Sequence, residues 1–358
     1  MQLRRTTVAT IALFAAFPSE AAPVSNDVLE FRGTCDASAG ARITDEVFVV
    51  ASDEDSVLRF YSWASPGLPI AERDLSEFLS EDGLEADIEA AARVGTRIFW
   101  ITSHGRNKQG KARPARRRFF ATDLVSKARL PDVLPIGVPY ESLLEALAVK
   151  LRLAELGLPD SIMLTEHRRL ELARENDGDQ HPMQINIEGL ATSDGASLLI
   201  AMRNPLVEGK AIVVPLHHPD ALISGEASAP QLGEPILLDL GGLGIRAIQR
   251  VDSSGTYLIA AGPTGKGKRF RIFRWERTKA DIIVPLEKAN LGGLTPEAIV
   301  LDANRPRALL LSDDGGRRVE VGDPDGCRKL KDGLCECKHL LAPADRSFRA
   351  RWIRWDQK

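Results

Sequence analysis

The stretch IEGLATSDGASLLIAMRNP, residues 187–205, is one of five related segments in this chain. It has a charged residue among small and apolar ones, then a polar turn, a strongly apolar run and a polar end. The other four are CDASAGARITDEVFVVASDED (35–55), IEAAARVGTRIFWITSHGR (88–106), IRAIQRVDSSGTYLIAAGP (245–263) and PEAIVLDANRPRALLLSDDG (296–315). An internal repeat of this kind predicts an architecture in which each copy is one structural unit.

The spacing of the copies indicates which architecture this is. Each copy reaches its polar end 15 to 17 residues after its opening charge, and the opening charges are Asp36, Glu89, Glu188, Arg246 and Glu297. Successive opening charges are 53, 99, 58 and 51 residues apart. A four-stranded propeller blade takes about 40 to 50 residues, so the longest interval must contain an insertion or a degenerate blade.

Further β-rich runs follow the copies and complete the prediction of an all-β fold. These runs are SVLRFYSW, RRFFATDLV, KAIVVPLHH, FRIFRW and RVEVG. We predict a single β-propeller domain of five or six blades over residues 22–358, with an amphipathic helical insertion at about 140–178. We also expect VLEF near the mature N-terminus to pair with FRARWIRW at the C-terminus and close the ring.

The N-terminus has the three parts of an export signal: a basic start, a short apolar core and small residues before a cleavage site. We interpret residues 1–21 as a cleaved signal peptide, with a frayed N-terminus as the alternative. The mature protein should then be soluble and periplasmic or secreted, with no membrane span. The formal net charge of −3 argues against a nucleic-acid binder.

Four cysteines, Cys35, Cys327, Cys335 and Cys337, allow three disulfide pairings in an exported protein. The alternative is a metal site formed by the last three with His339, although this spacing fits no standard zinc pattern. We favour disulfides because the compartment is oxidising. We also hypothesise that Cys35 pairs with the C-terminal group and holds the two ends of the chain together.

The predicted blade geometry brings charged residues together at one mouth of the central channel. In an antiparallel hairpin the start of the first strand lies beside the end of the second, so opening and closing residues should form two rings there. The closing residues are Asp53, Asp55, His104, Arg106, Arg203, Asn204, Asp313 and Asp314. The alternative is that these carboxylates and arginines only pair with one another and join neighbouring blades.

The residue types at this mouth suggest three roles. Carboxylates act as acids and bases or hold a hard cation such as calcium, and arginines bind anions through bidentate hydrogen bonds. The candidate catalytic residues are Glu89, Glu188, Glu297 and His104. The candidate metal ligands are Glu85, Asp87, Glu89, Asp36 and Asp313. The candidate substrate-binding residues are Arg106, Arg203, Arg246 and Asn204.

The acidic stretch EADIEA, residues 85–90, leads into the second copy. Helical spacing would put Glu85 and Glu89 on one face of a helix. The alignment of the copies instead makes Glu89 the start of an inner strand, and we adopt that interpretation. Glu85 and Asp87 then add negative charge to the same mouth.

A basic loop, GRNKQGKARPARRR (105–118), leaves the same mouth after the second strand of this copy. Long basic loops attract phosphate or other polyanions. The alternative is a solvated hairpin loop with no ligand. The loop contains no aromatic residues, which again argues against nucleic-acid binding.

Several segments together resemble a bacterial family catalogued as domain of unknown function 3616. They include GTCDASAGA, VVASDEDSVLRFY, INIEGLATSDGASLLIAMRNPLVEGKAIVVPL and PEAIVLDANRPRALLLSDDG, and they cover most of the mature chain. The resemblance implies a propeller-like β fold and no established activity. IEGLA, PEAIV and LLSDDG also look like phytase-related, esterase-like propellers, which implies acidic channel residues that bind calcium and act on phosphoesters.

Two hypotheses follow. In the first, the channel mouth binds a small anionic molecule, such as a phosphorylated one, through calcium; an enzyme of this kind would be a metal-dependent phosphoester hydrolase. In the second, the protein is a non-catalytic binding or scaffold propeller for a protein or polyanionic partner, with the helical insertion and the basic loop as its surfaces.

Overall fold

The computed structural model describes residues 28–79, 84–107, 112–125, 130–156, 185–194, 197–251, 253–265, 267–278 and 282–356. The predicted signal peptide, residues 157–178 of the predicted helical insertion, and Lys108 and Lys111 of the basic loop lie outside these residues. No helix within the described ranges is both long and apolar enough to cross a membrane.

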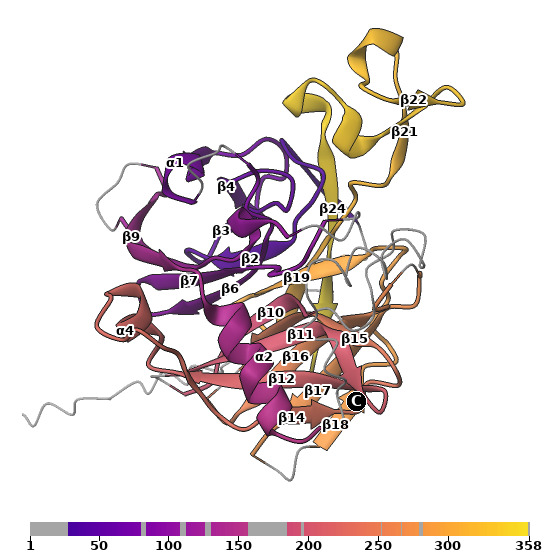
Figure 1. Cartoon of the computed structure of the whole chain (residues 1–358). Helices are drawn as coiled ribbons and strands as arrows, with labels where there is room; N and C mark the ends of the chain where they lie inside the picture. Colours follow the sequence, from indigo (N-terminus) through magenta and orange to yellow (C-terminus); the bar gives the residue numbers. More distant parts are fainter. Residues whose placement is uncertain are drawn as a thin grey trace, which may run out of the picture.

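Five large antiparallel sheets make up most of the described chain (Figure 1). The first contains β2 (Ala39–Arg42), β3 (Val47–Ala51), β4 (Val57–Ser62) and β5 (Ala71–Asp74). The second contains β6 (Ile88–Val94), β7 (Arg97–Thr102), β8 (Phe119–Leu124) and β9 (Val133–Tyr140). The third contains β10 (Asn186–Thr192), β11 (Ser197–Val207) and β12 (Lys210–His217), with both β13 (Gln231–Leu232) and β14 (Ile236–Leu238) on β12.

The last two sheets differ in how the chain supplies their strands. The fourth contains β15 (Gly244–Arg250), β16 (Thr256–Gly262), β17 (Arg271–Glu276) and β18 (Ile282–Pro285). The fifth contains β19 (Pro296–Leu301), β20 (Arg307–Ser312), β24 (Ser347–Arg354) and β1 (Leu29–Arg32). The fifth sheet therefore joins the two ends of the described chain, and the predicted closure of the ring is confirmed.

The first strands of the five sheets contact one another in the cyclic order β2, β6, β10, β15, β19 and back to β2. This ring of inner strands, with each sheet extending outward, is a β-propeller, as predicted. Small residues allow the inner strands to come close. A side chain at Gly189 of β10 would place its Cβ only 2.7 Å from the Cβ of Ala201 and 2.9 Å from Ile248 of the next sheet.

The hydrophobic core lies between neighbouring sheets. Phe60 and Trp100, for example, belong to a fully buried cluster between the first two sheets, and Tyr257 and Trp275 to another between the third and fourth. Because both faces of each sheet are covered, the strands are almost continuously apolar, with runs such as those in β7 and β20.

Among the described residues, three α-helices lie on the outside of this ring, and the longest of them falls within the predicted insertion. α2 (Leu143–Leu153) packs Leu143, Leu147 and Leu151 on the core between the second and third sheets. The shorter helices are α1 (Ser76–Leu79) and α4 (Pro219–Ile223). The described 3-10 turns are η1 (Pro114–Arg116), η3 (Pro324–Gly326), η4 (Cys337–His339) and η5 (Pro343–Asp345).

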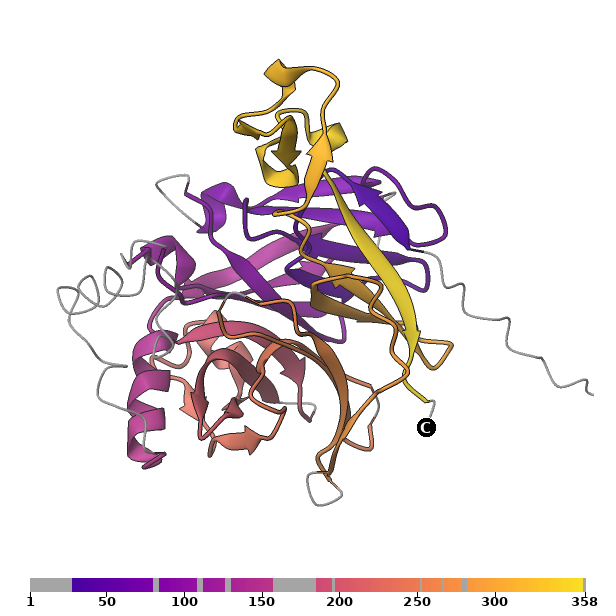
Figure 2. The same ribbon diagram turned by 90° about the vertical axis from the view of Figure 1, so that its right-hand side faces the viewer.

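A small C-terminal sheet projects from the ring between β20 and β24 (Figures 1 and 2). It contains β21 (Arg318–Glu320), β22 (Leu330–Lys331) and β23 (Leu334–Glu336). One disulfide, Cys327–Cys335, lies inside it, and a second, Cys35–Cys337, ties it to the start of the chain. The hypothesis that Cys35 pairs with the C-terminal group is confirmed. The metal-site alternative is wrong, because all four cysteines are bonded to one another.

Candidate functional site

Four of the five opening charges occupy β-bulges at the start of the inner strands. In β6 the pairing with β7 passes from Ile88 to Ala90, so Glu89 is the extra residue. The same shift occurs around Glu188 in β10, Arg246 in β15 and Glu297 in β19. A bulge inserts an unpaired residue and changes the direction in which its side chain points. The four bulges thus aim the four charges at one end of the channel.

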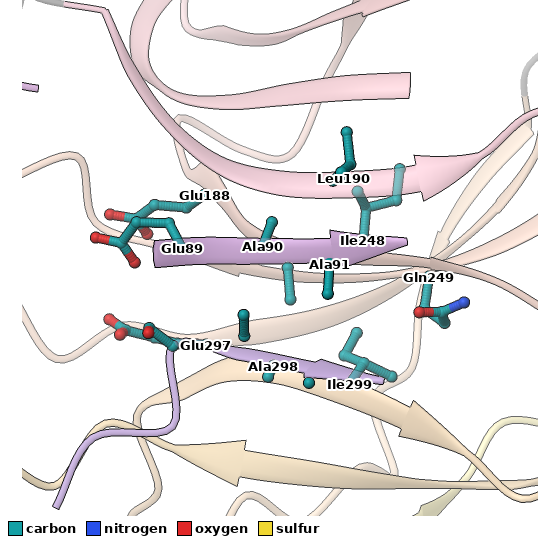
Figure 3. Close-up of a pocket in the computed structure, with 14 residues that line it drawn as sticks. Glu89, Ala90, Ala91, Glu188, Leu190, Ile248, Gln249, Glu297, Ala298 and Ile299 are labelled. Carbon is teal, nitrogen blue, oxygen red and sulfur yellow. The ribbon is translucent and has the colours of Figure 1, made fainter. Parts of the chain in front are cut away.

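The bulged residues line a cavity of about 370 Å³ at this mouth. Figure 3 shows the carboxylates of Glu89, Glu188 and Glu297 together at one end of the inner strands. The side chains around the cavity include eight carboxylates and six basic groups. The carboxylates are Asp53, Glu54, Glu85, Asp87, Glu89, Glu188, Glu297 and Asp313, and the basic residues are Arg106, Arg113, Arg116, Arg203, Arg246 and Lys338.

One part of the mouth is a linear chain of three ion pairs. Glu188 contacts Arg203 (Oε1 to Nη1, 2.9 Å) and Arg246 (Oε2 to Nε, 2.9 Å), and Arg246 also contacts Glu297. Burial lowers the pKa of Arg246, although Glu188 acts in the opposite direction. Arg203 is further held by the backbone oxygens of Pro263 and Gly265. These two arginines already have carboxylate partners, which is the arrangement that the ion-pair alternative predicted for this part of the mouth.

The EADIEA stretch forms a second paired group. β6 begins at Ile88, so the strand interpretation is confirmed. Arg116 pairs with Glu85 (2.5 Å) and Asp87 (3.0 Å), and Asp87 accepts a hydrogen bond from Ser103. Burial raises the pKa of Asp87 to about 6 in spite of Arg116 and Ser103. Two of the three carboxylates of this stretch are therefore paired.

The third carboxylate, Glu89, has no hydrogen-bond or ion-pair partner among the described residues, although it is only 9% exposed. Burial raises its pKa well above the usual value, and the negative charges of Glu188 and Asp87 act in the same direction. Asp53 is similar: its Oδ1 is buried without a partner, and burial followed by the charge of Asp313 raises its pKa. Among the described residues, Glu89 and the Oδ1 atom of Asp53 therefore lack a direct hydrogen-bond partner.

Asp36 and Asp313 form a third feature of the mouth. Burial raises the pKa of Asp36, as does its hydrogen bond with Asp313. Burial acts against ionisation of Asp313 too, but the bond with Asp36 and the Gly315 N–H (2.9 Å) hold its pKa below the usual value. One proton shared by the two carboxyls accounts for both directions.

Oxygen atoms of Asp36, Asp53 and Glu54 lie within 4.8 Å of one another. A set of carboxylate oxygens with this spacing suits a hard cation, because calcium binds six to eight oxygen ligands at about 2.3–2.6 Å. The donor chemistry fits calcium, and the uncompensated charge of Asp53 is consistent with a missing positive partner.

Lys338, from the C-terminal segment, contacts one of these carboxylates. Its Nζ lies 3.2 Å from Oε1 of Glu54. Burial opposes the charge of Lys338, but Glu54 and Asp36 raise its pKa. The sequence analysis did not identify Lys338, and the only signal for it was its position directly after Cys337.

Besides Asp36, four predicted residues lie away from the lining of the cavity. His104 is buried, and its Nδ1 lies 2.8 Å from the oxygen of Thr102. Burial lowers its pKa to about 4, so the ring is neutral at physiological pH. Three others have their own partners: Asn204 donates to Thr264, Asp55 pairs with Arg59, and Asp314 pairs with Arg349.

Three described arginines of the basic loop, Arg116, Arg117 and Arg118, pair with other parts of the protein. Arg117 pairs with Glu145 of α2 (2.8 Å), and Arg118 pairs with Glu141 (3.2 Å) and donates to the oxygen of Leu79. Along with Arg116, they hold the loop against the second sheet. Besides Lys338, the sequence analysis did not assign Glu54, Asn107, Arg113, Arg116 and Asn186 to the site, although all five line the cavity.

Residues 182–290 match the model of a family described as "Protein of unknown function (DUF3616)". This confirms the resemblance to DUF3616. The DUF3616 segment includes β10 to β18, and thus Glu188, Arg203 and Arg246 of the ion-pair chain. A search of curated proteins found no match. The weaker likeness to phytase-related propellers stays a prediction.

Comparison with solved structures found similar chains of low identity. Glutaminyl cyclase of Myxococcus xanthus is 11% identical with a TM-score of 0.39, and 91% of this chain and 95% of that chain are covered. PQQ-bound aldose sugar dehydrogenase of Streptomyces coelicolor is 13% identical with a TM-score of 0.36, covering 92% and 100%. Virginiamycin B lyase of Staphylococcus aureus is 8% identical with a TM-score of 0.32, covering 93% and 89%. Scores this low carry no argument about function.

Proposed function

We propose that this DUF3616 protein binds calcium at the carboxylate-rich mouth of its channel, and that a small anionic molecule completes the coordination of the ion. Asp36, Asp53 and Glu54 would hold the ion. The observation that carries the proposal is the pair of buried or partly buried carboxylates, Glu89 and Asp53, that face the cavity without a basic partner.

Electrostatics supports a cation at this position. Buried carboxylates that repel one another either take up protons or bind a positive ion. Burial, followed by repulsion from neighbouring carboxyl groups, raises the pKa of Asp53 and of Glu89, and burial also raises the pKa of Asp36; these directions support a cation at this position. A divalent ion would replace the protons of its ligands Asp36 and Asp53 at neutral pH and remove the repulsion between them, while Glu89 would keep its proton.

The basic groups of the mouth support the anion. Arg106 and Arg113 line the same cavity as two of the proposed ion ligands, Asp53 and Glu54. Three protein carboxylates leave coordination positions on calcium that water or ligand oxygens fill. An anion there would contact the ion on one side and guanidinium groups on the other, which suits a phosphate or carboxylate group.

Phosphoester hydrolysis is the catalytic extension of this proposal. Because its pKa is raised, Glu89 would keep a proton at higher pH than an ordinary carboxyl and could donate it to a leaving alcohol. Calcium, when bound, would supply charge stabilisation to the anionic substrate. His104, which is buried away from the cavity, takes no part in this scheme.

Thermal unfolding and calorimetry test the proposal. Protein freed of metal by chelation should gain stability as calcium is added, by about 2.7 kcal/mol at a concentration 100 times the Kd. Asp53→Asn and Glu89→Gln should weaken calcium binding. Glu226→Gln, which changes an exposed carboxylate far from the mouth, should not. An identical Tm in calcium and in chelator would refute calcium binding, and a phosphoester panel with Glu89→Gln tests turnover separately.

A further inference from the structure

Lys338 places an ammonium group at the proposed calcium ligands. Its Nζ lies 3.2 Å from Oε1 of Glu54, and Lys338 lines the same cavity as Glu54 and Asp53. Burial opposes the charge of Lys338, but all three proposed ligands act to raise its pKa. The ammonium therefore lies among the same carboxylates that would hold the ion.

The backbone of Lys338 is fixed at this position by two contacts. Its N–H donates to the oxygen of Gly315 (3.2 Å), and the preceding residue, Cys337, is bonded to Cys35. Gly315 in turn packs against Asp36, because a Cβ added to Gly315 would lie only 2.2 Å from Oδ1 of that carboxyl. The main chain of Lys338 is thus held beside a proposed ligand, whatever its side chain contacts.

The side chain of Lys338, in contrast, can change its partner at low energetic cost. The two side chains of its ion pair with Glu54 are 27% and 47% exposed, and pairs as exposed as this contribute little to stability. A lysine carries its charge on a flexible stem, with donors that rotate, and does not need the fixed geometry of a guanidinium. A fixed backbone and a loosely held ammonium together allow Lys338 to contact more than one group of the mouth.

A narrow apolar section separates the carboxylate-rich mouth from the opposite end of the channel (Figure 3). Its free volume is only about 10 Å³, and its lining includes small and aliphatic side chains such as Ala90, Ala91, Ala298 and Ile299. This section leaves no passage for a phosphate group within the described part of the chain. An ion and an anion bound at the carboxylate-rich mouth therefore share one cavity with Lys338.

The position of Lys338 has opposite consequences for the two proposed ligands. A divalent ion held by Glu54 would repel the ammonium on the same carboxylate, because like charges at contact distance oppose each other. An anion in the cavity would attract the ammonium, since lysine binds phosphate groups as a point charge. Arg106 and Arg113 line the same cavity and add to this attraction.

We propose that Lys338 is a tethered counter-ion of the candidate calcium site, which pairs with Glu54 in the metal-free protein and turns to the bound anion when calcium binds. This role of Lys338 rests on the proposed function and adds a coupling between its two ligands. The ammonium opposes the ion while the anion is absent, and it stabilises the anion once the ion has displaced it from Glu54. Such coupling is reciprocal, so the anion tightens calcium binding by the same factor by which calcium tightens anion binding.

Calorimetry with calcium alone, at low salt and without any added anion, tests the first half of this proposal. Lys338→Met should bind calcium at least about threefold more tightly than the wild type, because the competing charge is lost. Lys338→Arg keeps the charge and should stay closer to the wild type than Lys338→Met does. Lys331→Met is the matched control, since it removes an exposed lysine from β22 of the same C-terminal segment and should bind calcium as the wild type does.

A second titration tests the change of partner, with phenyl phosphate as the anion and calcium-saturated protein in the cell. The wild type should bind phenyl phosphate, and Lys338→Met should bind it at least about threefold more weakly. Lys331→Met should again equal the wild type. Phenyl phosphate should also tighten calcium binding more in the wild type than in Lys338→Met.

The outcomes separate this role of Lys338 from the proposed function. Calcium binding by the wild type, with equal or weaker calcium binding by folded Lys338→Met, would overturn the role of Lys338 and leave the calcium site intact. So would equal binding of phenyl phosphate by the two calcium-loaded proteins, or no binding by the wild type. Absence of calcium binding by the wild type would overturn the proposed function, and the role of Lys338 with it.

Discussion

Asp36 and Lys338 each follow directly after one cysteine of the disulfide Cys35–Cys337. The bond therefore brings a carboxylate from the first blade and a lysine from the C-terminal segment to the same channel mouth. There Lys338 contacts Glu54 and places a positive charge next to the buried carboxylates. A covalent link thus connects closure of the ring with the electrostatics of the candidate site.

The double variant Cys35→Ser, Cys337→Ser should be strongly destabilised. The two cysteines are 302 residues apart, and a loop of that length predicts a loss of about 5 kcal/mol on opening. Urea unfolding measures this loss of unfolding free energy. Cys327→Ser, Cys335→Ser is the matched control, because a separation of 8 residues predicts a loss of about 2–3 kcal/mol. Equal losses in the two variants would contradict a special role for the long-range bond.

Without calcium, the protein should lose stability as the pH rises from about 4. A carboxyl with a raised pKa in the folded state binds its proton more tightly there than in the unfolded chain, so folding is favoured at low pH and less so above the folded pKa. For Asp87 the window lies between its usual value of 3.8 and about 6. Glu89 and Asp53 extend the loss to higher pH.

Urea unfolding midpoints measured between pH 4 and 8 in chelator test this loss of stability. The comparison of wild type with Glu89→Gln isolates the contribution of Glu89. The variant should show a flatter pH profile, and calcium should flatten the profile of the wild type. A wild-type stability that increases steadily through this range would show that the carboxylates are not destabilising when ionised.

Arg246→Met should be among the most destabilising single changes at the mouth. It would leave Glu188 and Glu297 buried without their shared partner, which costs about 3–5 kcal/mol for a buried pair. Arg354→Met removes an arginine from a pair with Asp356 near the C-terminus, where solvent exposure predicts only a small loss of stability. Denaturant unfolding of the two variants should therefore differ severalfold, and a mild Arg246→Met would indicate that the ion pairs contribute little.

Gly315→Ala should disturb the carboxylate pair without removing any polar group. A Cβ at this position would lie 2.2 Å from Oδ1 of Asp36, so the carboxyl must move. We expect a loss of about 1–3 kcal/mol and weaker calcium binding. Gly316→Ala is the control, because nothing lies within 4 Å of its added Cβ. If both variants bind calcium equally well, Asp36 is not a ligand.

The sequence predicted the fold because the repeated hairpins keep their spacing and their apolar runs. It also predicted that Glu89, Glu188, Arg246 and Glu297 meet, since antiparallel pairing places the ends of a hairpin together. The bulges at these residues could not be predicted, because one extra residue in a strand leaves no mark in a continuous apolar run. The sequence therefore identified the four charged residues but not the β-bulges that direct their side chains toward the channel mouth.

Other parts of the site depend on contacts between different segments of the chain, and the residue pattern of a single strand does not indicate such contacts. His104 has the expected position at the end of β7, but its backbone turns to a φ of 55° and its ring is buried. Lys338 is held at the mouth by the Cys35–Cys337 bond and by its backbone hydrogen bond to Gly315, and neither contact can be inferred from one strand. Arg93 and Arg250, near the opposite ends of their inner strands, each follow a bulged charge by four residues, a spacing that the sequence analysis did not use.

The residues that line the two ends of the channel differ in charge. A formal net charge of −3 describes a nearly neutral protein, but carboxylates outnumber basic groups in the lining of one end, whereas three arginines and one aspartate line the other. The apolar section between them keeps the opposite charges apart. In the field of a charged surface the propeller would therefore turn one face toward that surface, and this face would differ for anionic and cationic surfaces.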